Sequence, residues 1–333
     1  MRRIALFDMF PEWPLARQTR AGALRWGDAE FAINPADGAF DGCVVFDGLL
    51  AETKISCPPD KTVFIAGEPP SIKAYHPGFL GQFHSVITCH SDTPHPRKLH
   101  REQGYPWHFG VARTQGGLMA RWDYDALVSA AATTKTKLIS AIVSDKTTTA
   151  GHRHRRALVA RLREHFGDQI DVFGRGIRDV PDKADGILPY RYHVALENSE
   201  FPDYWTEKLA DAFLGRAHPF YWGCPNIERY FPAASLTRIN IYDPDEAIST
   251  IDQAIAGQRY EKSATAVEAA RALVLDTYNL FALAAEVTLP LSGKAPSTFL
   301  LRPESFYRDS LRKRLSRRLR RAVPRQLRSG AKM

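Results

Sequence analysis

Short apolar runs alternate with polar turns over the first 125 residues of the chain. Runs of about four or five residues, separated by Gly, Pro and Asp, are typical of buried strands rather than of helices. They predict strands at 4–8, 43–46, 63–66 and 86–89. A helix is expected over 124–132, and the polar residues 133–137 after it indicate a connection between two domains.

The second half starts with a buried, parallel-type strand at 138–143 and then alternates helices with strands. We expect further strands at 170–173, 193–196, 219–221 and 236–241, and helices at 154–166, 204–214, 246–256 and 261–283. This alternation predicts a doubly wound α/β sheet that binds ligands at the carboxyl ends of its strands. The predicted divisions are an N-terminal domain at 1–133, a C-terminal domain at 134–290 and a tail at 291–333.

A length of 333 residues allows two domains with full cores. Two Rossmann-like halves without Gly-x-Gly-x-x-Gly at the first turn argue against NAD or FAD. They favour the two-domain glycosyltransferase architecture called GT-B, in which the active site lies in the interdomain cleft.

Polar residues gather at the start of the helix predicted over 204–214. Asp203 is expected to be its N-cap, with a side-chain oxygen accepting from free N–H groups of the first turn. Tyr204, Glu207 and Lys208 then share one face close to the helix N-terminus, where backbone donors attract anions.

A solvated helix start covered by a tyrosine is the simpler interpretation of this pattern. Two details favour a ligand. A capping box begun at Asp203 needs its acid at position 206, so Glu207 comes one residue too late. Lys208 opposes the helix dipole at a cost of roughly 0.3–1 kcal/mol, which a bound diphosphate reverses. Glu207 can accept hydrogen bonds from sugar or ribose hydroxyls, and Asn198 at the preceding strand end is a further polar candidate.

Three motifs stand in order here: Tyr-x-x-x-x-Ala-Leu-Glu-Asn-Ser from Tyr190, Tyr204-Trp-Thr-Glu-Lys208, and Pro219-Phe-Tyr-Trp-Gly223 followed by Pro-Asn. Over about 190–243 the chain resembles the family 10 glycosyltransferases, the α-1,3/4-fucosyltransferases. The resemblance implies a GT-B fold, GDP-fucose as donor, a glycan hydroxyl as acceptor, an inverting displacement and no metal or other cofactor. It also implies that Tyr204, Glu207 and Lys208 bind the donor, with Asn198 as a further donor contact.

A second stretch, from Val143-Ser-Asp to a His/Arg-rich helix start, resembles the family's Val-Ser-Asn loop and its phosphate-binding arginine. Arg155 fits best, because leucines follow it at the +3 and +7 positions. Arg153 is the rival, and Ser144 is a secondary donor-binding candidate. Asp145 replaces the usual Asn. Without the resemblance, this cluster is equally well read as a solvated helix start, although cations at a positive helix end favour a bound anion.

A third stretch, Val63-Phe-Ile-Ala-Gly-Glu-Pro, places Glu68 just past a strand. Pro69 favours an extended conformation for Glu68, so that its side chain projects from the edge of the sheet. A lone acid here is ordinarily a surface residue. The resemblance instead implies that Glu68 is the general base that deprotonates the acceptor hydroxyl, a step typically worth about 10²–10⁴ in rate.

The net charge of +8 is concentrated at the C-terminus, where 308–333 holds eleven Lys or Arg and one acid. Leucines at 311, 315 and 319 form one stripe, which predicts a basic amphipathic helix over 308–328 on an anionic membrane surface. A charge run alone also fits nucleic acid, but the regular leucine stripe favours a membrane or a partner helix. With four scattered cysteines and no signal peptide, we expect a cytoplasmic protein peripherally bound to the inner membrane.

Five histidines crowd the first half and suggest a metal: His84, His90, His95, His100 and His108. None forms a His-x-x-x-His pair on an evident helix, so acceptor contacts or plain surface are preferred, and no metal site is expected. The predicted function is fucosyl transfer from GDP-fucose to a glycan, α-1,3 to GlcNAc in lipopolysaccharide or another surface glycan. The alternatives are a relative that uses another GDP-sugar and a non-catalytic nucleotide-sugar-binding protein.

Overall fold

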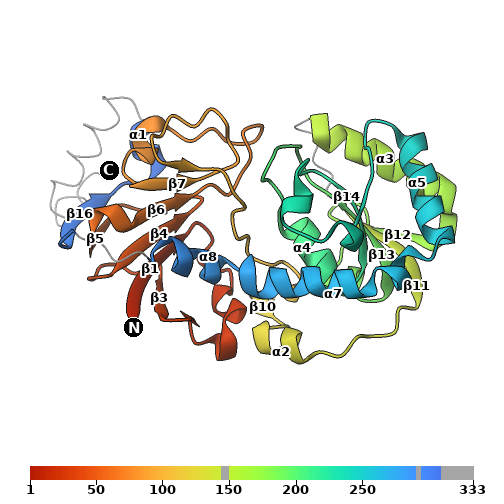
Figure 1. Cartoon of the computed structure of the whole chain (residues 1–333), viewed down its shortest axis with the longest axis horizontal. Coiled ribbons are helices and arrows are strands. Elements are labelled where there is room, and N and C mark those ends of the chain that lie inside the picture. Colours follow the sequence, from red (N-terminus) through yellow and green to blue (C-terminus); the bar gives the residue numbers. More distant parts are fainter. Residues whose placement is uncertain (144–149, 290–293, 309–333) are drawn as a thin grey trace, which may run out of the picture.

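The chain folds into two α/β domains that lie side by side along its long axis (Figure 1). The computed structural model describes residues 1–143, 150–289 and 294–308. The first domain contains a seven-stranded sheet in the order β2 (Arg25–Trp26), β3 (Ala29–Ile33), β1 (Arg2–Asp8), β4 (Gly42–Phe46), β6 (Thr62–Ile65), β7 (Ser85–Ile87) and β8 (Lys98–Leu99). All neighbouring strands pair in parallel except β2 and β3.

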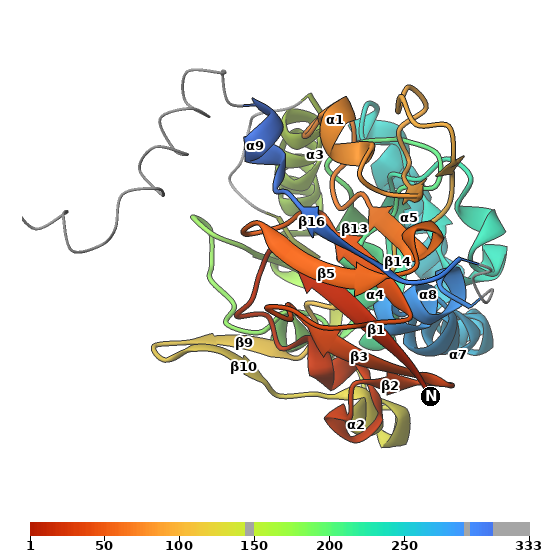
Figure 2. The ribbon, with the colours of Figure 1, turned by 90° about the vertical axis from the view of Figure 1, so that its left-hand side faces the viewer.

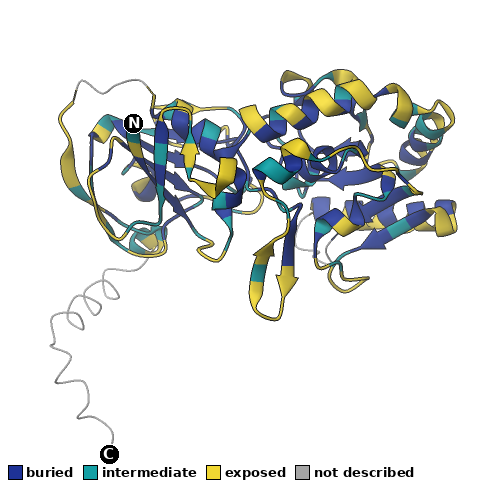
Figure 3. Cartoon of the chain, turned by 90° about the horizontal axis from the view of Figure 1, so that it is seen from below, coloured by how far each residue is buried: buried dark blue, intermediate teal, exposed yellow. Residues whose placement is uncertain are grey.

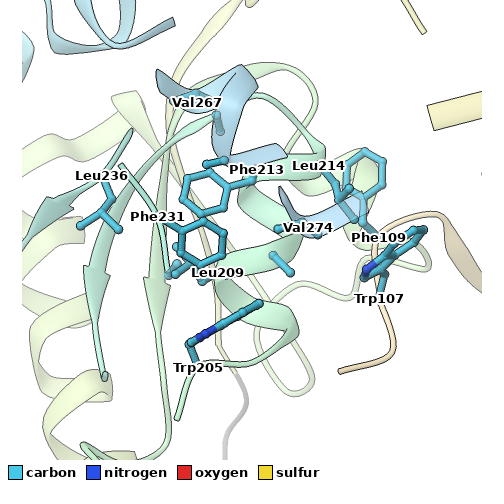
Figure 4. Close-up of a cluster of buried hydrophobic side chains, with 14 of the residues drawn as sticks. Trp107, Phe109, Trp205, Leu209, Phe213, Leu214, Phe231, Leu236, Val267 and Val274 are labelled. Carbon is cyan, nitrogen blue, oxygen red and sulfur yellow. The ribbon is translucent and has the colours of Figure 1, made fainter. Parts of the chain in front are cut away.

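The second domain contains a five-stranded, fully parallel sheet in the order β12 (Ile170–Phe173), β11 (Lys137–Ile142), β13 (Tyr190–Leu196), β14 (His218–Trp222) and β15 (Thr237–Arg238). Helices α3 (Ala150–Phe166) and α5 (Pro244–Ala256) cover one face, and α4 (Glu207–Leu214) and α7 (Ala264–Ala272) cover the other. Strand β13 illustrates why helices pack on both faces of this sheet. Val194 packs with α3 and Ala195 with α4, because successive strand side chains point to opposite faces. Figure 4 shows the α4 layer, where Phe213 packs near Val267.

Two parallel α/β domains with helices on both faces of the second sheet confirm the predicted α/β class and the GT-B architecture. The strand predicted at 170–173 has the observed bounds, whereas the one predicted at 236–241 shrinks to the two residues of β15. The strands that sequence analysis missed are short, half-exposed or at sheet edges: β2, β3, β5 (Thr53–Cys57), β8, β9 (Val111–Thr114), β10 (Gly117–Ala120) and β16 (Ser297–Leu301).

The helix predicted over 261–283 is wrong as a continuous element. Helix α6 (Arg259–Lys262), α7, a π-helical turn (Leu273–Thr277) and α8 (Leu280–Val287) follow one another instead. Asn279 begins α8, because its side chain accepts a hydrogen bond from the Phe281 N–H at 3.0 Å. Phe281 then packs edge-on against Phe31 of β3, with ring centroids 5.1 Å apart. Residues 280–287, assigned from sequence to the second domain, therefore lie in the core of the first.

The described C-terminal segment continues along the first domain. Strand β16 pairs antiparallel with β5, and α9 (Glu304–Arg308) follows it toward α1 (Pro77–Leu80) (Figure 2). The Glu304 carboxylate accepts a hydrogen bond from the His76 N–H at 2.6 Å. The residues expected to form a tail from 291 thus include a folded part at 294–308, and the predicted amphipathic helix lies almost wholly outside the described residues.

The connection between the domains has structure of its own. The hairpin of β9 and β10 projects from the molecule (Figure 3), and α2 (Tyr124–Ser129) follows it. Trp107 and Phe109, just before the hairpin, are buried in the α4 layer of the second domain, so the connection is fixed by packing. Within 1–143, 150–289 and 294–308, no helix is long and apolar enough to cross a bilayer.

Candidate active site between the two domains

Helix α4 begins at Glu207, and its N-cap is Thr206 rather than the predicted Asp203. The Thr206 hydroxyl oxygen accepts from the Lys208 N–H at 3.4 Å. Thr206 is itself held by Glu197, whose carboxylate oxygens accept from the Thr206 N–H at 2.8 Å and from its hydroxyl at 2.7 Å. Because Glu197 is buried just past the end of β13, it ties the helix start to the strand end. Glu207 and Lys208 are therefore the first two helical residues.

Asp203 has a different structural role. It adopts a left-handed conformation with φ of 61° in the turn before the helix. Its carboxylate accepts from the Tyr230 hydroxyl at 2.6 Å and from the Asn226 side-chain amide at 2.7 Å. Asn226 Oδ1 in turn accepts from the Asp203 N–H at 2.8 Å. The turn before α4 is thereby anchored to the segment after β14, which gives Asn226 of the sequence motif a structural role.

Glu207 and Lys208 belong to a network of five charges. Lys208 Nζ lies 3.1 Å from Glu207 Oε1 and 3.4 Å from Glu197 Oε2. Lys183 Nζ lies 3.4 Å from the same Glu207 oxygen and 3.0 Å from Asp211 Oδ2. Every ion of the network has a partner of opposite sign, which is the condition under which buried charges are tolerated.

The pKa values of Glu207 and Lys208 reflect two opposing effects, burial of the charged group and its pairing with opposite charges. Burial alone raises the pKa of Glu207, but Lys208 and Lys183 outweigh it and hold that pKa well below its usual range. Burial lowers the pKa of Lys208, but Glu207 and Glu197 outweigh it and raise the value to about 12. At neutral pH the start of α4 therefore presents a carboxylate and an ammonium of fixed charge.

Arg155 is buried on α3 and reaches the end of β13, where its Nη1 donates to the Leu196 carbonyl at 3.3 Å. Burial lowers its pKa, and the nearby charges of Glu197 and Glu207 oppose that effect. Arg155 thus stands beside the α4 charges, whereas Arg153 is exposed. Ser144 and Asp145 lie outside the described residues.

Asn198 and Tyr204 meet each other and the first domain. The Tyr204 hydroxyl donates to Asn198 Oδ1 at 3.0 Å. Its ring is almost fully buried, and it packs edge-on against Tyr105 with centroids 6.3 Å apart. Tyr204 therefore packs in the junction between the domains. It also contacts Asn198, another candidate donor-binding residue.

Glu68 lies on a rigid turn after β6. The Tyr75 hydroxyl oxygen accepts from the Gly67 N–H at 3.0 Å and from the Glu68 N–H at 3.1 Å, and it donates to Asp47 Oδ1 at 2.5 Å. On the other side, His90 Nε2 lies 2.7 Å from the Glu68 carbonyl oxygen. Burial raises the pKa of the Glu68 carboxyl, Asp47 adds to that effect, and Lys208 opposes it.

The charges of Lys208 and Glu207 are near enough to shift the pKa of Glu68 across the junction between the domains, so the two predicted halves of the site lie near each other. A direct contact lies beside them, since the Ser71 and Ser199 hydroxyl oxygens are 2.5 Å apart. The structure thus brings together Glu68, Lys208 and the residues around Lys208.

Sequence reasoning missed four members of this region. Glu197 was visible in the Glu-Asn-Ser motif, and its position directly after a buried strand was the signal for its role. Asp211 was visible as an acid on the otherwise apolar face of α4, where it accepts from the His108 and Phe109 N–H groups at 3.0 and 2.9 Å. Lys183 had no local signal. His108, whose Nδ1 lies 3.9 Å from Glu207 Oε1, was hidden among the five histidines.

The histidine side chains of the segment 84–108 do not meet at one site. His95 Nε2 lies 3.0 Å from the Phe83 carbonyl oxygen and His100 Nδ1 lies 3.2 Å from that of Thr88, both contacts that support loops. Among the described residues, no group of three or more His, Cys, Asp or Glu side chains is arranged to hold a metal ion.

Comparison with protein families decides what kind of domain carries the α4 network. Residues 132–258 match the C-terminal domain of glycosyltransferase family 10 (fucosyltransferase). This segment is a family 10 glycosyltransferase domain. The resemblance noted from the motifs is confirmed, and Arg155, Asn198, Tyr204, Glu207 and Lys208 all fall within the family 10 domain, whereas Glu68 lies outside it.

Individual relatives match shorter pieces of the chain. An α-(1,3)-fucosyltransferase, FucT, of Helicobacter pylori is 31% identical over 74 residues, which are 22% of this chain and 16% of the relative. Alpha-(1,3)-fucosyltransferase 4 of Rattus norvegicus is 38% identical over 87 residues, 24% of this chain and 20% of the relative. The matches thus span at most a fifth of these two relatives.

Among solved structures, an α1,3-fucosyltransferase with GDP aligns with a TM-score of 0.48 and 17% identity, over 84% of this chain and 92% of that one. The same kind of enzyme with GDP-fucose aligns with a TM-score of 0.46 and 15% identity, over 83% and 90%.

Proposed function

We propose that the protein transfers fucose from GDP-fucose to a hydroxyl of a glycan acceptor. The observation that carries this proposal is the position of the family 10 domain, whose paired Glu207 and Lys208 face Glu68 of the other domain. The names of the matched relatives, α-(1,3)-fucosyltransferases, support fucose as the transferred sugar and glycosyl transfer as the reaction class.

In the proposed mechanism the reaction is a single displacement with inversion. The acceptor oxygen bonds to the anomeric carbon as the bond from that carbon to the diphosphate oxygen breaks. Glu68 takes the acceptor proton, a role that its raised pKa suits, because a general base works best with a pKa nearer the working pH. Lys208 and Arg155 stabilise the charge that grows on the departing GDP, so no metal is required.

The donor contacts in this proposal are assigned from the charge of Glu207 and from the residues around it. Glu207, which stays ionised, accepts hydrogen bonds from ribose or sugar hydroxyls. Tyr204 and Asn198 flank it, and Ser144 and Arg153 are secondary donor contacts. We place the acceptor on the first domain, with an α-1,3 linkage to GlcNAc in lipopolysaccharide or another surface glycan.

The test is incubation of purified protein with GDP-fucose and N-acetyllactosamine-type acceptors in the presence of EDTA. Fucosylated product is expected, with the rate unchanged by the chelator. Transfer from another GDP-sugar but not from GDP-fucose would overturn the donor assignment. GDP binding without turnover of any donor would instead support a non-catalytic nucleotide-sugar-binding protein.

The pH dependence of transfer is expected to report Glu68. Activity should fall as pH falls through the raised pKa of Glu68, because the protonated carboxyl accepts no proton. Asp47→Asn removes a charge that contributes to the raised value, so the acidic limb of the kcat profile should move to lower pH. The exposed Asp37→Asn is the control, and a limb that stays in place in Asp47→Asn contradicts the assignment.

We further propose that the 308–328 tail binds an anionic membrane surface and holds the enzyme at the inner membrane. Arg308, where the described segment ends, donates to the Ala74 carbonyl, so the tail departs from the acceptor-side domain. Removal of 309–333 is expected to release the protein from anionic liposomes in a flotation assay. Undiminished liposome binding, or tail-dependent binding to duplex DNA alone, would contradict this proposal.

A further inference from the structure

The backbone of the turn that carries Glu68 is held by side chains rather than by a neighbouring strand. The Tyr75 hydroxyl oxygen accepts from the Gly67 and Glu68 N–H groups at 3.0 and 3.1 Å. The Tyr105 hydroxyl donates to the Gly67 carbonyl at 2.8 Å, and the His90 ring lies 2.7 Å from the Glu68 carbonyl oxygen. All four contacts go to the backbone, so they fix where Glu68 leaves the chain without using its carboxylate. We call Tyr75, His90 and Tyr105 the backbone clamp.

The Tyr75 hydroxyl uses every hydrogen bond that it can make. A hydroxyl has two acceptor sites, which the two N–H groups occupy, and one donor, which points to Asp47 Oδ1 at 2.5 Å. Burial and the charge of Asp47 raise the pKa of Tyr75 well above its usual range, so the hydroxyl keeps the proton that it donates. Asp47 is held in turn by Lys73, whose Nζ lies 3.0 Å from the same carboxylate oxygen and donates to the Asp47 carbonyl at 2.8 Å. The hydroxyl is therefore fixed by a paired carboxylate.

Packing and protonation strengthen the clamp on the two other sides of the turn. A Cβ added to Gly67 would lie 2.7 Å from the Cβ of Asp47, so the turn has no room to move toward Asp47. Burial lowers the pKa of His90, so its ring is neutral at pH 7. Since a carbonyl oxygen only accepts, the His90 hydrogen must be on Nε2, the atom that faces Glu68.

Tyr105 connects the backbone clamp to the second domain. While its hydroxyl holds Gly67, its buried ring packs edge-on against the ring of Tyr204. Tyr204 in turn donates to Asn198. One side chain thus contacts both the turn of the candidate base and a candidate donor-binding residue, which sets the position of the turn relative to the donor side of the site.

We propose that the backbone clamp positions Glu68 for proton transfer, with Tyr75 and Tyr105 acting through the backbone of the base rather than on the substrate. This inference rests on the proposed function. A general base must lie within hydrogen-bond reach of the proton that it takes, and a misplacement of about 1 Å can cost on the order of 10² in rate. Because no strand pairs with Gly67 or Glu68, the clamp supplies the contacts that hold this position.

Kinetics of hydroxyl-deletion variants test the clamp. Tyr75→Phe keeps the ring, removes three hydrogen bonds and is expected to lower the kcat of fucosyl transfer by about 10–100-fold, with the KM of GDP-fucose unchanged. Tyr105→Phe loses one bond and should lower kcat by about 3–10-fold. Tyr190→Phe is the matched control, because that hydroxyl donates to Asp171 at 2.6 Å at the amino end of β13, and its kcat should equal that of the wild type.

Repeating Tyr75→Phe in a Glu68→Gln background separates positioning from a general structural role. If the clamp acts through the Glu68 carboxylate, kcat should not fall further in the double variant. A general structural role would lower kcat by the same factor in both backgrounds. Equal factors, or full kcat in the single variant Tyr75→Phe, overturn the inference while wild-type fucosyl transfer stands.

Amide hydrogen exchange tests the clamp without turnover. The Gly67 and Glu68 N–H groups should exchange at least about tenfold faster in Tyr75→Phe than in the wild type, while the amides of β6 keep their protection. Unchanged exchange at these two residues overturns the inference whether or not a donor turns over. Faster exchange in a protein whose wild type transfers no sugar overturns the proposed function, and with it the catalytic role of the clamp.

Discussion

Replacing Glu68 by glutamine is expected to lower the kcat of fucosyl transfer by about 10²–10⁴. Glutamine keeps the size of the side chain and its place on the turn held by Tyr75, but it accepts no proton from the acceptor. The Kd of GDP should remain that of the wild type, because Glu68 lies outside the family 10 domain. The measurement is initial-rate kinetics with a saturating acceptor, paired with calorimetry of GDP binding.

The matched control is Glu52→Gln, which changes another partly exposed acid of the first domain, one whose carboxylate lies 3.9 Å from Arg302 Nε. Its kcat should equal that of the wild type. Full activity in Glu68→Gln would remove Glu68 from the mechanism and reopen the search for the base. Equal loss of activity and of GDP binding would indicate a misfolded site.

Replacing Lys208 by glutamine is expected to have the second largest effect, for two separable reasons. Loss of the cation removes stabilisation of the leaving diphosphate and should lower kcat by about 10²–10³. It also leaves Glu197 without a cationic partner in a buried position, which should lower the free energy of unfolding by about 3 kcal/mol. The loss lies at the low end for a broken buried pair, because Lys183 still pairs with Glu207.

Two measurements separate the two effects of Lys208→Gln. Denaturant unfolding gives the change in the free energy of unfolding. The kcat, measured at denaturant concentrations where the variant is still folded, gives the effect on catalysis. Lys137→Gln is the control. That lysine is 52% exposed and pairs with Asp171 at 2.8 Å at the amino end of β11, opposite to the strand ends that carry the site. Undiminished kcat in Lys208→Gln, with lowered stability, would leave Lys208 a purely structural residue.

The parts of this fold that could be predicted are those in which periodicity and burial agree. Strands β1, β4 and β12 are apolar runs with clear ends, and α5 has an N-cap at Asp243 and an apolar stripe, so their positions follow from local sequence. The candidate site residues were chosen through the motifs. Glu207 and Lys208 were correctly placed at a helix start, although their cap was assigned to the wrong residue.

What could not be predicted depends on contacts between distant segments. Asp203 is a good N-cap by residue type, but its hydrogen bonds to Tyr230 and Asn226 hold it in the turn, and Thr206 is preferred because Glu197 already orients it. Lys183 opens a short 3-10 helix (Lys183–Gly186) between β12 and β13, and it enters the site only through its long-range pairs with Glu207 and Asp211 of α4. The helix break at Asn279 follows from local sequence, because Asn279 caps α8. The position of α8 instead depends on its packing against an apolar surface of the first domain.

That return of the chain has a consequence for its synthesis. Helix α8 and strand β16 come later in the sequence than every strand of the second domain's sheet, and both complete the first domain rather than the second. During synthesis, every strand of the second domain's sheet therefore leaves the ribosome before Phe281 and β16 do. At that stage the first domain still lacks Phe281 in its core and a partner for β5. Domains generally fold as units in order of emergence, but here the N-terminal unit finishes last. Until then its exposed strand edge is open to mispairing, and prematurely terminated chains are expected to aggregate through that domain.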